Sequence, residues 1–185
     1  GALENQMDVL RTVEGRGPLL GNAADVVGVV RDPLELARTF EESKLPVLQV
    51  KSSDDPPTAD GSWLLKPINS AGGRRSDLRF RVLTQQPTGN PLLNAPPFAW
   101  CGSIGPVTLS VESEHLMRRI GNFLSWRFGL RGLFGCDFVL AADGTPYLTE
   151  VNPRYPASAE VLEHVLEFDL VGNHCASFGL EVPPP

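Results

Sequence analysis

Two acidic residues flank the dipeptide Asp143-Gly144, each within an apolar stretch of chain. Asp-Gly between two strand-forming stretches is a strong signal for a β-hairpin with a two-residue turn. Such a turn would place Asp137 directly opposite Glu150, with their Cβ atoms roughly 4.5–5.5 Å apart. Asn152, two residues beyond Glu150, would point to the same face of the hairpin. The sequence therefore predicts two carboxylates and one carboxamide side by side.

Two carboxylates held opposite one another repel, which costs stability unless a cation lies between them. Carboxylate oxygens are hard ligands that suit Mg²⁺, which commonly bridges protein carboxylates to the phosphates of a substrate. The alternative is a solvent-facing pair of strands whose acids happen to align, since most charged residues lie on wetted surfaces. Because Asp137 and Glu150 both lie among apolar neighbours, they need a partner, and a bound cation is the favoured interpretation.

A lysine and a glycine-rich segment form a second candidate site. Lys66 follows apolar residues 63–65 and precedes a loop of small residues that contains Ser70, Gly72 and Gly73. A lysine at the end of a strand can offer a positive charge to a phosphate, and glycines let backbone N–H groups approach the oxygens. The spacing matches neither the Walker P-loop nor the Rossmann fingerprint. On general grounds a solvated strand end is the alternative.

The composition is that of a folded, acidic protein. Of 185 residues, 42% are hydrophobic and 21% are charged, and the formal net charge is −6. This charge argues against nucleic acid as a partner, because binding to phosphates needs a basic surface. The local exception is a cluster of arginines, namely Arg74, Arg75, Arg79 and Arg81. The cluster either holds an anion or lies in a solvated loop, and we favour the loop.

Cysteine usage and hydropathy bear on the location of the protein. No apolar stretch approaches the roughly 20 residues that span a bilayer, so no membrane association is expected. Cys101, Cys136 and Cys175 are odd in number and far apart, which fits neither a disulfide framework nor a zinc site. Reduced thiols are expected, and with them a cytoplasmic protein.

Capping residues and hydrophobic periodicity predict the main elements. Asp32, Pro33 and Glu35 together are typical of a helix start, and that helix would extend to about Ser43. A second helix is expected over 111–128, between a cap at Ser110 and a stop at Gly129. Short strands are expected at 45–50, 63–67, 133–140 and 147–151, and a last helix at 159–170. The three helices would bury Leu34, Ala37 and Phe40; Leu116, Ile120, Phe123, Leu124 and Phe128; and Val161, Leu162, Val165 and Leu166.

Residues 82–110 show no clear period, and prolines and glycines recur along them. Structureless stretches of that length are uncommon in compact domains. The stretch is therefore either a functional loop region or a sign that chain is missing near residues 80–82.

The predicted hairpin resembles the metal-binding half of the ATP-grasp superfamily. The resemblance rests on residues 129–140, Gly-Leu-Arg-Gly-Leu-Phe-Gly-Cys-Asp-Phe-Val-Leu, and 143–154, Asp-Gly-Thr-Pro-Tyr-Leu-Thr-Glu-Val-Asn-Pro-Arg. In that family an acid on one strand and a Glu-x-Asn-x-Arg stretch on the next bind one or two Mg²⁺ ions against the phosphates of ATP. The resemblance implies that the metal ligands are Asp137, Glu150 and Asn152. It further implies that Arg154 contacts the γ-phosphate or an acyl phosphate.

The lysine loop also resembles this family, in which a phosphate-binding lysine precedes a glycine-rich flap. Given the hairpin, the resemblance implies that Lys66, Ser70, Gly72 and Gly73 bind the nucleotide. Many ATP-grasp enzymes carry a basic residue, similar in place to Arg31, that reaches the nucleotide phosphates. A surface arginine is the alternative at that position.

The resemblance implies an α+β fold, the ATP-grasp fold, in which two α+β subdomains clasp ATP. Residues 31–185 would form this domain, with a segment missing near 80–82, because nothing in this part resembles the family's adenine-binding hinge. Residues 1–30 would be the tail of a truncated N-terminal α/β domain.

The implied function is that of an ATP- and Mg²⁺-dependent ligase, with Mn²⁺ as a second candidate metal. It would activate a small carboxylate as an acyl phosphate for attack by an amine or a thiol. Such chemistry needs no side-chain nucleophile, which agrees with the lack of a Ser-His-Asp or Cys-His pattern. The alternative is a catalytically inactive nucleotide-binding module of the same fold with a regulatory or scaffold role. A homodimer is compatible with the sequence.

Overall fold

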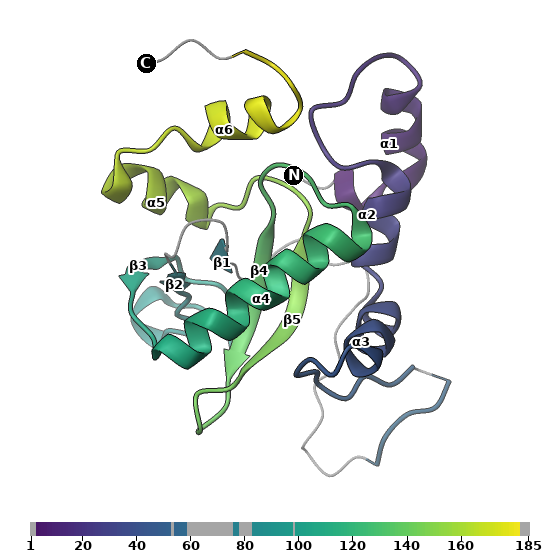
Figure 1. Cartoon of the computed structure of the whole chain (residues 1–185). Helices are drawn as coiled ribbons and strands as arrows, with labels where there is room; N and C mark the ends of the chain where they lie inside the picture. Colours follow the sequence, from purple (N-terminus) through teal and green to yellow (C-terminus); the bar gives the residue numbers. More distant parts are fainter. Residues whose placement is uncertain (1–2, 53, 59–75, 78–82, 98, 182–185) are drawn as a thin grey trace.

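A long helix crosses one face of a small antiparallel sheet, and shorter helices surround the two (Figure 1). The computed structural model describes residues 3–52, 54–58, 76–77, 83–97 and 99–181. Its helices are η1 (Leu3–Asn5), α1 (Met7–Glu14), α2 (Ala24–Val30), α3 (Pro33–Glu42), η2 (Pro91–Leu93), α4 (Val111–Phe128), α5 (Ser158–Leu166) and α6 (Leu170–Ser177). Its strands are β1 (Ser76–Asp77), β2 (Leu83–Gln85), β3 (Ile104–Val107), β4 (Gly135–Leu140) and β5 (Pro146–Asn152). The predicted α+β class is confirmed.

The β4–β5 hairpin has a longer turn than the sequence predicted. The three-stranded sheet has the order β1-β4-β5 and is antiparallel throughout. In the turn, the amide of Ala141 donates to the carbonyl of Thr145 at 2.9 Å, and Gly144 adopts a φ of +84°. This is a loop whose last residue is left-handed, a common hairpin connection that glycine favours. The expected two-residue turn is therefore wrong.

A β-bulge at Thr149 restores the predicted pairing farther along the hairpin. Phe138 pairs with Leu148, whereas the next pair is Asp137 with Glu150, so Thr149 is the extra residue. Its hydroxyl donates to the backbone carbonyl of Asp137 at 3.1 Å. A bulge adds one residue to one strand and shifts the register by one. The longer turn and the bulge cancel, and Asp137 lies opposite Glu150 as predicted.

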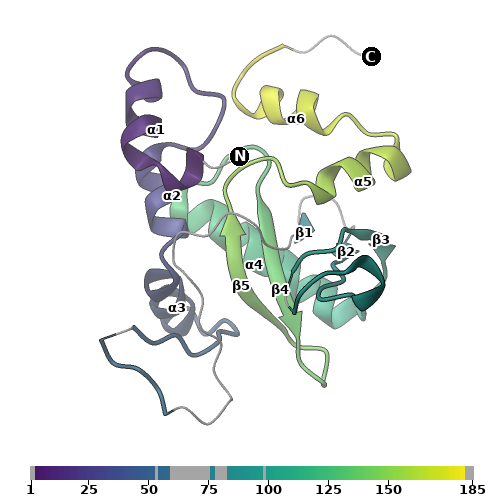
Figure 2. The ribbon, with the colours of Figure 1, turned by 180° about the vertical axis from the view of Figure 1, so that it is seen from behind.

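The bulge also decides which side chains of β5 face the core. Leu148 and Val151 are three positions apart, so in a regular strand they would point to opposite faces. With the extra residue between them, both join the core cluster, together with Cys136 and Phe138 of β4. The acidic pair therefore points to the face of the sheet that α4 does not cover, which is turned toward the viewer in Figure 2.

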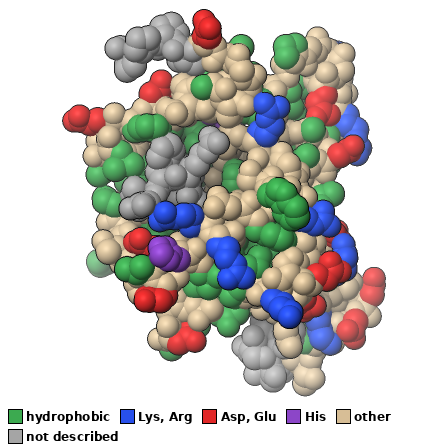
Figure 3. Space-filling model, viewed as in Figure 1, with side chains coloured by type: hydrophobic (Ala, Val, Ile, Leu, Met, Phe, Trp, Pro, Cys, Tyr) green, Lys and Arg blue, Asp and Glu red, His purple; other side chains and the backbone are tan. Residues whose placement is uncertain are grey.

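Helix α4 has the predicted bounds. The Ser110 hydroxyl accepts from the amide of Ser113 at 3.1 Å, and Gly129, with a φ of +72°, ends the helix. Ile120 and Leu124 are fully buried, and the half-buried members of the predicted stripe, Leu116, Phe123 and Phe128, pack against the same core. The face of the molecule that carries α4 has basic, acidic and hydrophobic side chains interspersed (Figure 3).

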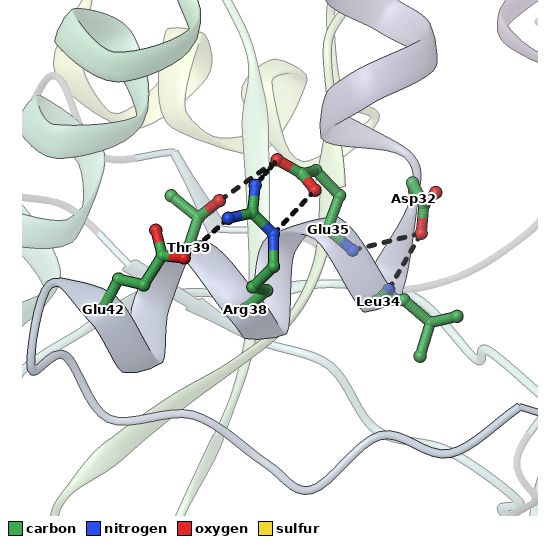
Figure 4. Close-up of polar contacts among 6 residues, drawn as sticks. All are labelled: Asp32, Leu34, Glu35, Arg38, Thr39 and Glu42. Carbon is green, nitrogen blue, oxygen red and sulfur yellow. Dashed lines mark hydrogen bonds and ion pairs between the residues drawn. The ribbon is translucent and has the colours of Figure 1, made fainter.

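Helix α3 begins as predicted but buries a different face. The Asp32 carboxylate accepts from the amides of Leu34 and Glu35, at 2.9 and 3.2 Å, and the Glu35 side chain turns to Arg38 (Figure 4). Leu36 is buried and Leu34 is 43% exposed. The predicted burial of Leu34 is wrong, because two residues at 3.6 per turn lie nearly opposite each other.

Two further expectations need correction. Residues 45–50 form no strand, since Val47 makes only a single parallel bridge, to Leu148 of β5. The stretch 82–110 is not structureless, because β2 and β3 pair in a two-stranded antiparallel sheet. Their strands of three and four residues are too short to show a period in the sequence.

The predicted helix over 159–170 is two helices. Glu167 adopts a φ of +48°, which ends α5, and the Asp169 carboxylate caps α6 through the amide of Gly172. Leu162 is 1% exposed as expected, but Val165 and Leu166 are 49% and 39% exposed. Their predicted burial is wrong because the helix turns away from the core where it ends.

Residues 3–30 form helices with a small core of their own. Leu10, Ala24 and Val27 pack together between α1 and α2, while Val30 joins the main core. Their assignment to the tail of another domain stays a prediction, and the junction at 80–82 lies outside the described residues. No disulfide joins the three cysteines. Among the described helices, none has the length and hydropathy that a bilayer crossing requires.

Candidate metal and phosphate site

Asp137 and Glu150 form the centre of the candidate site. They are directly paired across β4 and β5. Asn152 lies two residues farther along β5, where it is paired with Gly135. Asp137 is 4% exposed and Asn152 is 2% exposed, and the Glu150 side chain is 13% exposed. The structure thus brings together the three predicted metal ligands, in a place that little water reaches.

Arg31 provides a positive charge against this acidic pair. It is the residue that ends α2, and its Nη1 donates to Glu150 Oε1 at 2.8 Å. Its Nη2 donates to Asn5 Oδ1 at 2.9 Å, and the whole side chain is 8% exposed. The solvated-arginine alternative is therefore wrong for Arg31 in this structure.

Arg154 lies just beyond β5 and contacts a second buried acid. Its Nε donates to Glu4 Oε2, and its Nη1 lies 3.4 Å from the carbonyl of Tyr155. Glu4 Oε1 lies 4.0 Å from Arg31 Nη1, and the Glu4 side chain is 4% exposed. The two arginines and the carboxylates of Glu4 and Glu150 form one buried network. Sequence reasoning missed Glu4, because it lies 150 positions from Arg154 and no local pattern marks it.

Asn22 holds the backbone just before Arg154 in place. Sequence reasoning missed this residue as well. Its Oδ1 accepts from the amide of Arg131 at 2.8 Å, and its Nδ2 donates to the carbonyl of Pro153 at 3.3 Å. These bonds join the loop before α2 to the segments that flank the hairpin. No local pattern in the sequence marked this role.

The lysine loop cannot be placed beside these residues. Lys66, Ser70, Gly72 and Gly73, and the arginines Arg74, Arg75, Arg79 and Arg81, lie outside the described residues. A separate hollow of about 330 Å³, lined in part by Glu14, Asn22 and Phe178, contains neither strand carboxylate.

The donor set at the hairpin fits a hard divalent cation. Asp137 and Glu150 offer carboxylate oxygens, and the buried Nδ2 of Asn152 has no hydrogen-bond acceptor among the described residues. A half-turn of that carboxamide would present Oδ1 at the same place, as a metal ligand requires. Within the described ranges no three His, Cys, Asp or Glu residues could hold a metal together. Two carboxylates and a carboxamide suit Mg²⁺, which uses one or two carboxylates and fills its other positions with water and substrate phosphates.

Comparison with known proteins agrees with the fold and with this part of the chain. Residues 81–158 match the ATP-grasp domain family, and this range includes Asp137, Glu150, Asn152 and Arg154. The similarity to this family is thus limited to residues 81–158. Among solved structures, it is similar to a single-chain, multi-domain long-chain acyl-CoA carboxylase, with a TM-score of 0.66 and 20% identity. Together with the family match, this similarity confirms the predicted fold class.

The compared chains differ greatly in length. The match covers 98% of this chain and 18% of the carboxylase chain. No curated protein matches the chain in sequence. At 20% identity the similarity concerns the fold alone, so the roles of individual residues must be argued from their own geometry.

Proposed function

We propose that the chain is the ATP- and Mg²⁺-binding part of a ligase that activates a carboxylate as an acyl phosphate. The observation that supports this most directly is the buried pairing of Asp137 with Glu150, with Arg31 beside it. Acids buried in this way need cations, and nucleotide phosphates need cations as well. One site can meet both needs when a metal and arginines lie between acids and phosphates.

Each residue of the site has a distinct role in this proposal. Asp137, Glu150 and Asn152 hold Mg²⁺, or Mn²⁺, which when bound would neutralise charge on the phosphates. Arg31 and Arg154 orient the phosphate oxygens with their planar donor groups. Lys66, Ser70, Gly72 and Gly73 are also assigned to binding of the nucleotide. Catalysis is then mainly positioning and charge stabilisation rather than covalent chemistry by the protein.

The proposed reaction has two steps. A carboxylate oxygen of the substrate attacks the γ-phosphorus of ATP, the bond to the β-phosphate oxygen breaks, and ADP leaves. An amine or thiol then attacks the acyl carbon, and inorganic phosphate leaves with the former carboxylate oxygen. Arg154 stabilises the transferring group, because its guanidinium shares Glu4 with Arg31, which in turn contacts Glu150.

Release of ADP tests the proposal. A panel of small carboxylic acids is offered with ATP and Mg²⁺, with and without amines and thiols, and ADP is measured. We expect release that depends on the metal and on one class of acid. Glu150→Gln should abolish it, whereas Glu112→Gln, on the exposed first turn of α4, should not. Unchanged activity of Glu150→Gln would refute the site assignment.

A nucleotide-binding module without turnover is the second candidate. Tight binding of ATP with Mg²⁺ but no ADP release with any acid would support the module. A thermal shift assay separates both from a scaffold, because a ligand that binds only the folded state raises the unfolding temperature.

The partners and location follow from the same proposal. The substrates would be a small carboxylate and an amine or thiol, with no nucleic acid and no membrane. We propose a cytoplasmic location, on the number and spacing of the three cysteines in the sequence.

A further inference from the structure

Glu4 lies between the two arginines to which the proposed function gives phosphate contacts. Its Oε2 accepts from Arg154 Nε, and its Oε1 lies 4.0 Å from Arg31 Nη1. Only 4% of its side chain is exposed. A carboxylate so deeply buried is stable only with cationic partners, and these two arginines supply them.

A count of charges relates the place of Glu4 to that of an anionic ligand. Without it, Arg31 and Arg154 would balance the strand carboxylates Asp137 and Glu150. A divalent cation on those carboxylates would then leave a positive excess at the arginines, which an anionic ligand would neutralise. In the structure, the Glu4 carboxylate supplies negative charge at that place.

The arginine groups around Glu4 also have the geometry of an anion-binding site. Arginine presents its N–H groups in a planar fork that binds carboxylate and phosphate oxygens in the same way. An anion that uses both guanidinium groups must therefore occupy the place of the Glu4 carboxylate. The two ligands exclude each other.

We propose that Arg31 and Arg154 form a phosphoryl-binding site and that Glu4 is its internal competitor, which fills the site when no phosphate ligand is bound. This inference rests on the proposed function for the identity of the anion. Residues 3–6 must withdraw from the arginines before a polyphosphate can bind to both. Glu4 thereby sets the concentration of phosphate ligand at which the site opens.

Residues 3–6 are held by hydrogen bonds whose loss would reveal such a withdrawal. Asn5 Oδ1 accepts from Arg31 at 2.9 Å, so η1 contacts this arginine through two successive residues. The amide of Gln6 donates to the carbonyl of Leu3 at 2.9 Å and closes the turn. Displacing Glu4 would break these bonds and expose the Gln6 amide to exchange with solvent.

Binding of inorganic pyrophosphate without divalent metal tests the proposal. We compare the wild type with Glu4→Gln, which keeps the shape of the side chain and removes its charge. The matched control is Asp8→Asn, which removes one negative charge from an exposed position on the neighbouring α1. If Glu4 fills the site in about nine-tenths of the molecules, its removal raises the apparent affinity about tenfold. Asp8→Asn should change the affinity less than about twofold, as an exposed, screened charge does.

Two further measurements keep the result clear. Adding Arg154→Gln to Glu4→Gln should cancel the gain in affinity. In the wild type, saturating pyrophosphate should speed hydrogen exchange at the Gln6 amide, a readout that does not depend on how any variant folds. Equal affinities for Glu4→Gln and Asp8→Asn, no binding to folded Glu4→Gln, or unchanged exchange at Gln6 would each overturn the proposal. A gain in pyrophosphate affinity without any ADP release would support the anion site and refute the proposed ligase activity.

Discussion

Replacing Arg31 by Met should destabilise the protein far more than a surface arginine would. The Arg31 side chain is 8% exposed and holds Glu150, itself 13% exposed, through a contact of 2.8 Å. Removing one partner of a buried pair leaves the other charge buried without compensation, which costs about 3–5 kcal/mol. Glu4 keeps its contact with Arg154, so we expect Arg31→Met to lower the free energy of unfolding by about 3 kcal/mol, at the low end of that range.

Arg38 provides a matched control for this substitution. It lies on α3, where it pairs with Glu35 and Glu42 at 2.6 Å each, but its side chain is 53% exposed (Figure 4). Because solvent screens such pairs, Arg38→Met should lower stability much less, although it breaks as many ion pairs at closer distances. Urea unfolding followed by circular dichroism measures both variants. Equal losses would show that burial does not control the strength of this network.

The same variant offers a test of the metal site. Arg31→Met leaves Glu150 without its cation, so a divalent ion gains more by binding beside it. Mg²⁺ should therefore raise the unfolding midpoint of Arg31→Met more than that of the wild type, since a ligand of the folded state stabilises by mass action. An equal response to Mg²⁺ in the two proteins would contradict Glu150 as a metal ligand.

Three other outcomes are expected. Thr149→Val removes the hydroxyl that bonds across the bulge and should cost about 1 kcal/mol in urea unfolding; no loss would mean that the bulge is held by the backbone alone. Gly132→Ala puts a Cβ into the His174 ring at a φ of +68° and should cost about 1–3 kcal/mol; stability equal to the wild type would refute the close approach. The hydrogen bond from Arg38 holds the pKa of Glu35 below its usual value, so the stability from this pair is present at neutral pH and disappears as pH falls through the folded-state pKa. An NMR titration that follows the side-chain carboxyl carbon of Glu35 should show the lowered pKa, and Arg38→Met should raise this pKa toward its usual value.

The sequence predicted the hairpin pairing because two local irregularities cancel. Asp143-Gly144 marked a turn, but its exact length depends on the left-handed conformation that Gly144 adopts. The bulge depends on Leu148 and Val151 both reaching a core that α4 provides. Neither the turn length nor the bulge follows from residue types alone, since tertiary packing selects among registers of similar local energy.

Elements with local signals were predicted well, and contacts between distant segments were not. The bounds of α4 follow from the Ser110 cap and from the left-handed conformation of Gly129, both of which are local signals. Glu4 and Asn22, by contrast, reach partners more than one hundred positions away. Their burial is the only sign of their roles, and burial arises only when the chain has folded.

Arg31 connects the acidic pair to the phosphate contacts, which makes the two halves of the site interdependent. While it is bonded to Glu150, its guanidinium is shared between that acid, Asn5 and Glu4. A cation held by Asp137 and Glu150 would release Arg31 toward an anion, so Mg²⁺ should raise the affinity for pyrophosphate. Couplings of this kind amount to about 1–3 kcal/mol and are reciprocal. Pyrophosphate should then raise the affinity for Mg²⁺ by the same factor, and Arg31→Met should weaken this coupling while Arg38→Met keeps it. Equal coupling in Arg31→Met and the wild type would show that the two ligands meet each other directly, without the exchange of partners at Arg31.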